Sequence, residues 1–233
     1  LLLWMSHPAW PSMVWQIYSW DYETFGSFYG CRKACEPIHI QKNLDDQKVV
    51  VVNTSLKEIK GAKVIYEVYS LEGKSLFKRT SKLNVLANGL TECFVQDKPI
   101  SASGVYMERL ILQDKRGKVI SINDYWQDNG EGDFQGFNAL EEASINCKLI
   151  RQKESQIQIE LQNTGAMPAL ALKLNVREAD TDKRILPAYA SDGYFNLLPG
   201  EKRTVTVEYV SRGKVAISAE GYNLKRSRLL TLK

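Results

Sequence analysis

The sequence predicts a mostly β protein in which a short N-terminal strand and helix precede two antiparallel β-sandwiches. Three observations lead to this prediction. Four of the five tryptophans lie in the first twenty residues, in an apolar segment that does not read as the start of a sandwich. From Ile38 onward, apolar residues recur with a period of two between turn residues, which is typical of strands with one buried face. Residues 127–138 are rich in glycine and acidic residues and are the best candidate for a linker between domains.

The first 37 residues are predicted to form half of a β/α unit. Residues 1–6 are an apolar run that suits a fully buried strand. A helix is expected over about residues 23–35 and ends before Pro37. Gly26 and Gly30 lie four positions apart, so they share one face of this helix and would allow close approach of a neighbouring element.

The first sandwich is predicted over residues 38–127. Turn signals such as Glu72-Gly73-Lys74 and Lys115-Arg116-Gly117 separate short runs of alternating residues. Seven short strands without a helix favour a sandwich of immunoglobulin-like type. The expected strands are 38–42, 48–53, 62–70, 75–81, 89–96, 104–113 and 117–123.

A second immunoglobulin-like sandwich is predicted over residues 139–233, where the alternation is cleaner. Each apolar stripe indicates an antiparallel strand with one buried face and one wet face. The turn Leu198-Pro199-Gly200-Glu201 leads into the last of these strands. The stripes are Ile145, Cys147 and Leu149; Ile157, Ile159 and Leu161; Leu170, Leu172, Leu174 and Val176; and Val205, Val207 and Tyr209.

An internal echo indicates that the two sandwiches share a topology. Asn53-Thr54 ends one predicted strand shortly before another begins, and Asn163-Thr164 does the same in the second half. With the offset that aligns these pairs, the side-chain phase of the following strands also matches. The aligned positions include Lys63 with Lys173, Val64 with Leu174, Tyr66 with Val176 and Leu76 with Leu186.

Composition excludes several functional classes. The net charge of +4 is small and spread along the chain, so no nucleic-acid interface is expected. The cluster Lys225, Arg226 and Arg228 is interpreted as a solvated C-terminal segment. The apolar N-terminus lacks a basic region and a cleavage site, and prolines interrupt it, so neither a signal peptide nor a membrane span is predicted.

The cysteines show no metal-ligand spacing, and the chain has only two histidines, so neither a metal site nor a cofactor is predicted. Cys31 and Cys35 lie four apart on the expected helix, where side chains rarely reach disulfide geometry. Cys93 and Cys147 fall in expected strands. Buried free thiols are expected for all four.

Five sequence blocks resemble glycoside hydrolase family 2, in particular its β-mannosidase and exo-β-glucosaminidase type. WPSxxWQxY at residues 10–18 and GSFYGCRKACEPIHIQ at residues 26–41 resemble the end of the family's catalytic barrel. DDxxVVVVN at residues 45–53 is similar to the first C-terminal immunoglobulin-like domain. DGYFxLLPGExRTV at residues 192–205 and EGYNL at residues 220–224 resemble the last domain.

This resemblance implies that residues 1–37 are the last strand and helix of a (β/α)8 barrel, followed by two terminal sandwiches. It implies a parent enzyme that cleaves β-mannosides, β-glucosaminides or related β-glycosides with retention, using two glutamates about 5–5.5 Å apart. In the family these glutamates follow barrel strands four and seven, so this chain would hold neither, and no catalytic residue is nominated. The partners implied are an oligosaccharide or polysaccharide and the rest of the barrel, in a secreted or periplasmic enzyme.

Four residues at the expected barrel rim are candidates for substrate binding. Ser6, His7 and Trp10 would fall just past the last barrel strand, on the catalytic face, and Trp4 would lie inside that strand. Aromatic rings at the rim can stack on a sugar, and a histidine can hydrogen-bond a hydroxyl. The alternative is that Trp4 and Trp15 pack the barrel or the helix. Relatives often carry Asn or Asp where this chain has Ser6-His7-Pro8, which leaves the substrate open.

Two other functions remain open: a stand-alone carbohydrate-binding module, and a sandwich pair for adhesion or assembly. The aromatic candidates for a sugar platform are Tyr125, Trp126, Tyr189, Tyr194 and Phe195. Each would otherwise belong to a core or an interdomain seam. Neither alternative explains a Trp-rich strand and helix at the start of the chain. The sequon Asn53-Thr54-Ser55 is interpreted as an incidental match outside a secreted eukaryotic protein.

Overall fold

The computed structural model describes residues 2–12, 16–96, 104–128, 130, 132–210 and 213–232. Its described strands form four sheets, which confirms the prediction of a mostly β fold. The chain divides into two compact units, one of Arg32–Leu140 and one that combines Leu1–Cys31 with Glu141–Lys233. We call the sheets of the first unit the first sandwich and those of the second unit the second sandwich. Residues 2–31 are called the N-terminal segment.

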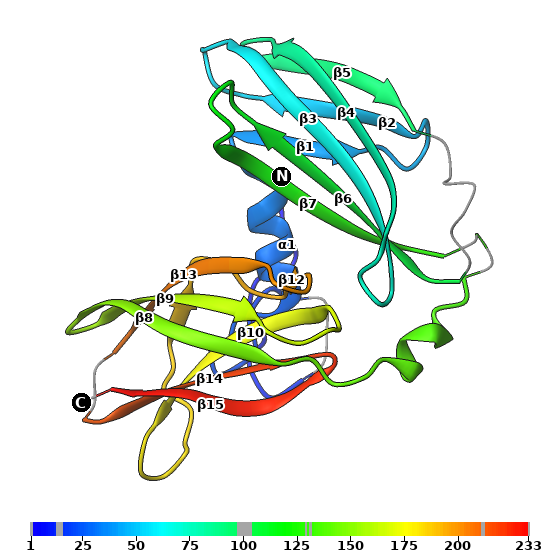
Figure 1. Cartoon of the computed structure of the whole chain (residues 1–233). Coiled ribbons are helices and arrows are strands. Elements are labelled where there is room, and N and C mark those ends of the chain that lie inside the picture. Colours follow the sequence, from blue (N-terminus) through cyan, green and yellow to red (C-terminus); the bar gives the residue numbers. More distant parts are fainter. Residues whose placement is uncertain are drawn as a thin grey trace. The chain divides into compact units, whose positions relative to one another are not determined.

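The first sandwich pairs a three-stranded sheet, β1-β2-β5, with a four-stranded sheet, β4-β3-β6-β7 (Figure 1). All seven predicted strands are present. The largest differences are that β3 begins earlier and β4 and β7 end later than expected. The early start of β3 includes Gly61, whose φ of 65° permits the irregular register there. The strands are β1 (Ile38–Lys42), β2 (Lys48–Asn53), β3 (Ile59–Ser70), β4 (Ser75–Val85), β5 (Gly89–Val95), β6 (Tyr106–Gln113) and β7 (Val119–Gln127).

The second sandwich pairs the sheets β11-β13-β9-β8 and β12-β10-β14-β15 (Figure 1). The four predicted stripes are β8, β9, β10 and β13. The remaining four strands were not predicted: β11 and β12 are only three residues long, and β14 is buried on both faces, so it lacks alternation. The strands are β8 (Ile145–Lys153), β9 (Gln156–Asn163), β10 (Ala169–Glu178), β11 (Ala188–Ala190), β12 (Phe195–Leu197), β13 (Lys202–Tyr209), β14 (Val215–Gly221) and β15 (Leu224–Leu232).

A buried asparagine at the same place in each sandwich confirms the internal echo. The Asn53 amide nitrogen donates to the carbonyls of Lys57 (2.9 Å) and Leu86 (2.8 Å). The Asn163 amide nitrogen donates to the carbonyls of Met167 (2.8 Å) and Leu197 (2.9 Å). Both asparagines are fully buried, so each ties the end of one strand to the opposite sheet.

The strand orders of the two sandwiches also correspond. The series β1-β2-β5 matches β8-β9-β13, and β4-β3-β6-β7 matches β12-β10-β14-β15. The aligned pair Leu76 and Leu186 is an exception, because Leu76 lies on β4 and Leu186 lies outside the strands. The sequon at Asn53 is not available as a glycan acceptor in this fold, since its amide is buried and engaged.

The first sandwich encloses an ion pair within its core. The Lys42 ammonium lies 2.8 Å and 3.0 Å from the two Glu108 carboxylate oxygens. Tyr66 donates its hydroxyl proton to the same carboxylate at 2.8 Å. Burial, and then the Glu108 charge, raise the pKa of Tyr66 above its ordinary value. A buried charge is stable only when paired and hydrogen-bonded in this way.

All four cysteines are free, as predicted. Burial raises the pKa of Cys93 on β5 and of Cys147 on β8 to about 11, which makes these thiols unreactive. The expectation of full burial is wrong, because Cys35 is exposed and the other three cysteines are partly buried. Cys35 follows the C-terminal end of α1 (Gly26–Ala34), a helix without a fully buried residue.

Replacing either repeated asparagine by alanine is expected to destabilise its sandwich by about 2–4 kcal/mol, because two backbone carbonyls lose the buried amide that donates to them. Urea unfolding of Asn53→Ala and Asn163→Ala measures this loss. The control is Asn146→Ala, an exposed asparagine on β8, which is expected to change stability by less than about 0.5 kcal/mol. Losses at Asn53 and Asn163 no larger than at Asn146 would contradict the structural role.

Candidate functional site

The start of the N-terminal segment is extended and open. The strand predicted over residues 1–6 is not formed in the part of it that the structure describes, since residues 2–12 contain no strand. Leu2 is 99% exposed and Trp4 is 81% exposed. The physical reason is that an apolar strand needs flanking strands for its backbone hydrogen bonds, and no described strand pairs with it. Leu1 and Trp15 lie outside the described residues.

Residues 18–24 form a tight turn, which we call the 18–24 turn. Tyr18 and Thr24 pair as an antiparallel bridge. Within the turn, the Ser19 amide donates to the Glu23 carbonyl at 2.9 Å and the Tyr22 amide donates to the Ser19 carbonyl at 3.0 Å. Tyr22 adopts a left-handed conformation with φ of 67°, which is unfavourable for a bulky residue and must be held by its surroundings.

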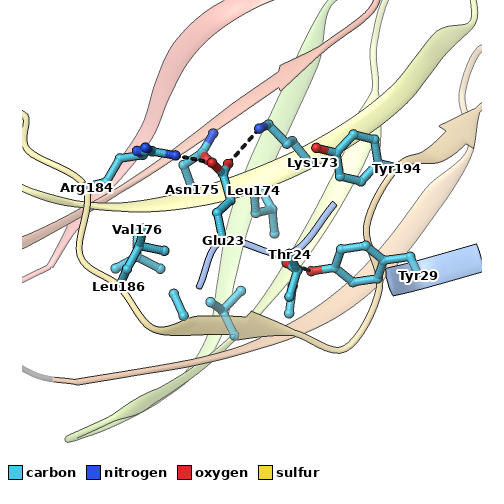
Figure 2. Close-up of a pocket in the computed structure, with 13 residues that line it drawn as sticks. Glu23, Thr24, Tyr29, Lys173, Leu174, Asn175, Val176, Arg184, Leu186 and Tyr194 are labelled. Carbon is cyan, nitrogen blue, oxygen red and sulfur yellow. Dashed lines mark hydrogen bonds and ion pairs between the residues drawn. The ribbon is translucent and has the colours of Figure 1, made fainter. Parts of the chain in front are cut away.

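The 18–24 turn is fastened to the second sandwich by four charged residues, which we call the clasp: Asp21, Glu23, Lys173 and Arg184. The Lys173 ammonium on β10 lies 2.8 Å from a Glu23 carboxylate oxygen. The Arg184 guanidinium contacts the other Glu23 oxygen and lies 2.8 Å from Asp21 Oδ2. Figure 2 shows Glu23 between the two cations. The clasp therefore joins residues that are about 150 positions apart in the sequence.

Lys173 is further bound by Glu220 on β14, at 3.0 Å, and Asn175 donates to the same Glu220 oxygen at 3.1 Å. Burial by itself lowers the pKa of the Lys173 ammonium, but the hydrogen bonds to Glu23 and Glu220 outweigh burial and raise it. For Glu220, burial favours the neutral form, yet the bonds from Lys173 and Asn175 lower the pKa. Lys173 and Glu220 are therefore both charged at neutral pH.

The helix α1 is held to the second sandwich by Tyr29. The ring lies against Gly193, where an added Cβ would stand 2.6 Å from Tyr29 Cζ, and packs on the second core. The Tyr29 hydroxyl lies 3.0 Å from the Thr24 hydroxyl. Burial raises the pKa of Tyr29. Of the two helix glycines, Gly26 faces the Tyr194 ring, whereas nothing lies within 4 Å of a Cβ at Gly30, so close approach is confirmed only at Gly26.

A small cavity lies beside the clasp (Figure 2). Its volume is about 30 Å³, which is enough for a water-sized group and far too small for a sugar ring. Thr24 and Tyr29 line one side of it, and Val176 and Leu186 line another. This cavity is part of the attachment of the N-terminal segment and not a substrate pocket.

The structure brings two of the predicted sugar-binding residues to the 18–24 turn. The His7 ring stacks on the Tyr22 ring with centroids 4.5 Å apart, and His7 Nε2 lies 3.2 Å from the Trp20 carbonyl oxygen. The Ser6 carbonyl accepts a hydrogen bond from the Tyr18 amide at 3.1 Å.

The other two predicted residues, Trp4 and Trp10, are 81% and 69% exposed. Trp20 and Tyr22, which sequence analysis did not nominate, are 51% and 54% exposed and lie beside His7. The signal for them was the alternation of aromatic and acidic residues in Trp20-Asp21-Tyr22-Glu23.

The aromatic residues of the sandwiches mostly serve packing. Tyr125 accepts a hydrogen bond from the Lys42 amide at 3.1 Å, and Trp126 packs edge-on against Phe137 at 5.2 Å. Phe195 is buried in the second core. Tyr189 keeps 39% of its surface exposed. These contacts indicate that the aromatic residues pack the protein interior and do not form a continuous carbohydrate-binding surface.

Within the described residues, no group of three or more His, Cys, Asp or Glu side chains is arranged to hold a metal ion. The same part of the chain contains no helix that is both long and apolar enough to cross a bilayer.

Gly193→Ala is expected to lower the free energy of unfolding by about 1–3 kcal/mol, because the new methyl group must displace the Tyr29 ring. Urea unfolding followed by circular dichroism measures the change. Gly30→Ala is the control: with open space around it in a helix, it is expected to stabilise the chain by up to about 1 kcal/mol. A Gly193→Ala variant as stable as the wild type would show that the close contact between the Tyr29 ring and Gly193 does not contribute to stability.

The Glu220→Gln variant is expected to lose less folding stability on acidification than the wild type. The folded pKa of Glu220 lies below its ordinary value of 4.5, so its stabilising effect is present above that value and is lost as the pH falls through the folded pKa. Urea midpoints between about pH 6 and 3 should therefore decline less steeply in Glu220→Gln than in the wild type. Glu142→Gln, which removes an exposed partner of Lys225, should leave the slope unchanged. Equal slopes in Glu220→Gln and the wild type would refute the expectation.

Two known domain families match the two sandwiches. Residues 123–224 match the family model of the exo-β-D-glucosaminidase Ig-fold domain, and residues 45–129 match that of the mannosidase Ig/CBM-like domain. Exo-β-D-glucosaminidases of Arthroderma benhamiae and Amycolatopsis orientalis are 25% and 27% identical over 97% and 96% of this chain. The chain spans only 28% and 24% of their lengths.

Solved structures agree with these matches. The exo-chitosanase of Amycolatopsis orientalis superposes with a TM-score of 0.86 and 26% identity, over 97% of this chain and 30% of that protein. A β-D-mannosidase of Dictyoglomus thermophilum shares the fold with a TM-score of 0.70 and 18% identity, over 95% of this chain and 26% of that protein. The resemblance seen in the sequence is confirmed: the chain matches a C-terminal immunoglobulin-like region of exo-β-glucosaminidases and β-mannosidases, the type of glycoside hydrolase family 2 that its motifs resemble.

Proposed function

We propose that the protein containing this chain is a retaining glycoside hydrolase acting on β-glucosaminides, β-mannosides or related β-glycosides, and that this chain is its C-terminal accessory region. The observation that carries the proposal is the similarity to the exo-chitosanase across nearly the whole chain. Relatives named exo-β-D-glucosaminidase make a β-glucosaminide the first substrate to test. A polysaccharide-derived substrate suits a secreted or periplasmic enzyme.

Residues 1–37 are proposed to complete the catalytic barrel as its last strand and helix. Leu2, Trp4 and Trp10 form an exposed apolar stretch in the chain, and large apolar patches usually mark an interaction surface. The remaining barrel would supply both the apolar cover and the neighbouring strands that residues 2–6 lack. The sandwiches then brace the barrel from its C-terminal side.

The chemistry would come from the part of the barrel that lies outside this chain. A retaining mechanism needs one carboxyl as acid and base and a second as nucleophile. The acidic residues of the N-terminal turn, Asp21 and Glu23, are instead engaged with Arg184 and Lys173. Both carboxylates are therefore already occupied by cations. The isolated chain is therefore proposed to be inactive.

Within the assembled enzyme, Trp4, Ser6, His7 and Trp10 are proposed to line the substrate site. Aromatic faces suit the apolar face of a sugar ring, and an imidazole can form hydrogen bonds with hydroxyl groups. This proposal is supported by the solvent exposure of Trp4 and Trp10, which both expose most of their surface. The His7 ring is held in place by Tyr22.

The test compares the full-length protein with the isolated chain 1–233 on p-nitrophenyl β-D-glucosaminide and p-nitrophenyl β-D-mannoside. We expect the full-length protein to release p-nitrophenol from at least one substrate and the isolated chain to release none. A full-length protein inactive on both glycosides would contradict the proposed activity. Turnover by the isolated chain would contradict its accessory role.

A further inference from the structure

We infer that Arg184 and Lys173 of the second sandwich are positioning residues for substrate binding: through the clasp they hold the 18–24 turn so that Trp20, Tyr22 and His7 form one sugar-facing group. This inference rests on the proposed glycosidase function. It adds Trp20 and Tyr22 to the substrate-lining residues and assigns the second sandwich a part in substrate recognition.

The first step of the argument is the alternation within the 18–24 turn. Asp21 and Glu23 direct their carboxylates to Arg184 and Lys173. Trp20 precedes Asp21, and Tyr22 lies between Asp21 and Glu23. Both aromatic residues keep about half of their surfaces exposed. Because Trp20 and Tyr22 are the direct chain neighbours of the two bound carboxylates, the clasp also fixes the backbone that carries the two aromatic rings.

The second step is the strained backbone of Tyr22. A left-handed φ of 67° for a tyrosine costs free energy and persists only where the surrounding structure enforces it. The neighbours on each side, Asp21 and Glu23, are the two residues that the clasp immobilises. The conformation therefore depends on the clasp, and strain of this kind is concentrated at ligand-binding and active sites.

The third step connects the turn to the predicted sugar-binding residues. His7 stacks on Tyr22 at 4.5 Å with the two ring planes 17° apart, and its Nε2 lies 3.2 Å from the Trp20 carbonyl. The Ser6 carbonyl is bound by the Tyr18 amide. Movement of the turn would therefore displace His7 and Ser6 as well as its own aromatic rings.

The chemistry of this group fits a hexopyranoside. Trp20 and Tyr22 keep about half of their surfaces exposed, and aromatic rings bind the C–H face of a sugar. The His7 ring, stacked on one face of Tyr22, adds a polar group beside them. The ligand class is the non-reducing end of a β-linked glucosaminide or mannoside. The role of Arg184 and Lys173 is indirect, since both cations are occupied by carboxylates.

The test uses three Arg184 and Asp21 variants of the full-length protein, with p-nitrophenyl β-D-glucosaminide and β-D-mannoside as substrates. Arg184→Gln removes both ion pairs of the guanidinium, Arg184→Lys retains the positive charge, and Asp21→Asn removes one ion pair while Glu23 keeps its partners. Arg226→Gln is the control, because Arg226 lies in the same sandwich and its ion pair is with Asp182, at 2.9 Å, and not with Asp21 or Glu23.

We expect Arg184→Gln to raise KM about tenfold or more with a smaller change in kcat, because a displacement of about 1 Å in a substrate-positioning group has effects of that size. Arg184→Lys should recover part of the loss, Asp21→Asn should raise KM by a smaller factor, and Arg226→Gln should stay within about twofold of the wild type. Asp21→Asn also provides the test if Arg184→Gln fails to fold.

A second readout does not depend on activity. Chymotrypsin cleaves after aromatic residues, so the isolated chain should be cut within the 18–24 turn faster in Arg184→Gln than in Arg226→Gln or the wild type. An active wild-type enzyme whose KM is unaffected by both Arg184→Gln and Asp21→Asn would overturn the inference. Equal cleavage rates in all three chains would also overturn it. A wild-type enzyme inactive on both glycosides would overturn the proposed function instead.

Discussion

The attachment of the N-terminal segment to the second sandwich depends on charged residues in a partly buried position. Glu23 lies between Lys173 and Arg184, and Arg184 also binds Asp21. Removing such groups from water is costly unless each charge has a partner, and here every member of the cluster has one. Together with the Tyr29 ring against Gly193, this cluster explains why the first 31 residues form one compact unit with Glu141–Lys233, the part of the chain most distant in sequence.

The two sandwiches solve one structural problem in the same way. Backbone carbonyls where the chain passes between the two sheets of a sandwich need donors, and a buried amide that donates twice satisfies two of them. Asn53 and Asn163 do this at corresponding positions. The sandwiches differ in what they bury beyond this point. The first contains the ion pair of Lys42 and Glu108, whereas the second uses its charged residues to bind the N-terminal segment.

The two sandwiches and the exposed N-terminal segment together suit a role in which rigid domains support a binding surface. Groups that contact a substrate are most accurate when their own conformations are held by packing and hydrogen bonds behind them. The 18–24 turn has this arrangement, because its carboxylates are bound and its aromatic rings are exposed. Family resemblance, read from the sequence, pointed to Ser6, His7 and the neighbouring tryptophans. It could not indicate that residues near position 180 hold them.

The sequence by itself determined the β architecture, the two sandwiches, the short helix and the family resemblance. These features depend on local periodicity and on motifs such as the repeated Asn-Thr pair, and both are visible along the chain. It missed β14, because a strand buried on both faces lacks alternation. For residues 2–6 it predicted a strand that is not formed here, because an apolar run has the same pattern whether it pairs with neighbours or lies open. Only the tertiary structure showed that Arg184 and Lys173 meet Asp21 and Glu23. Contacts between distant charges leave no periodic signal, since either partner alone reads as an ordinary surface residue.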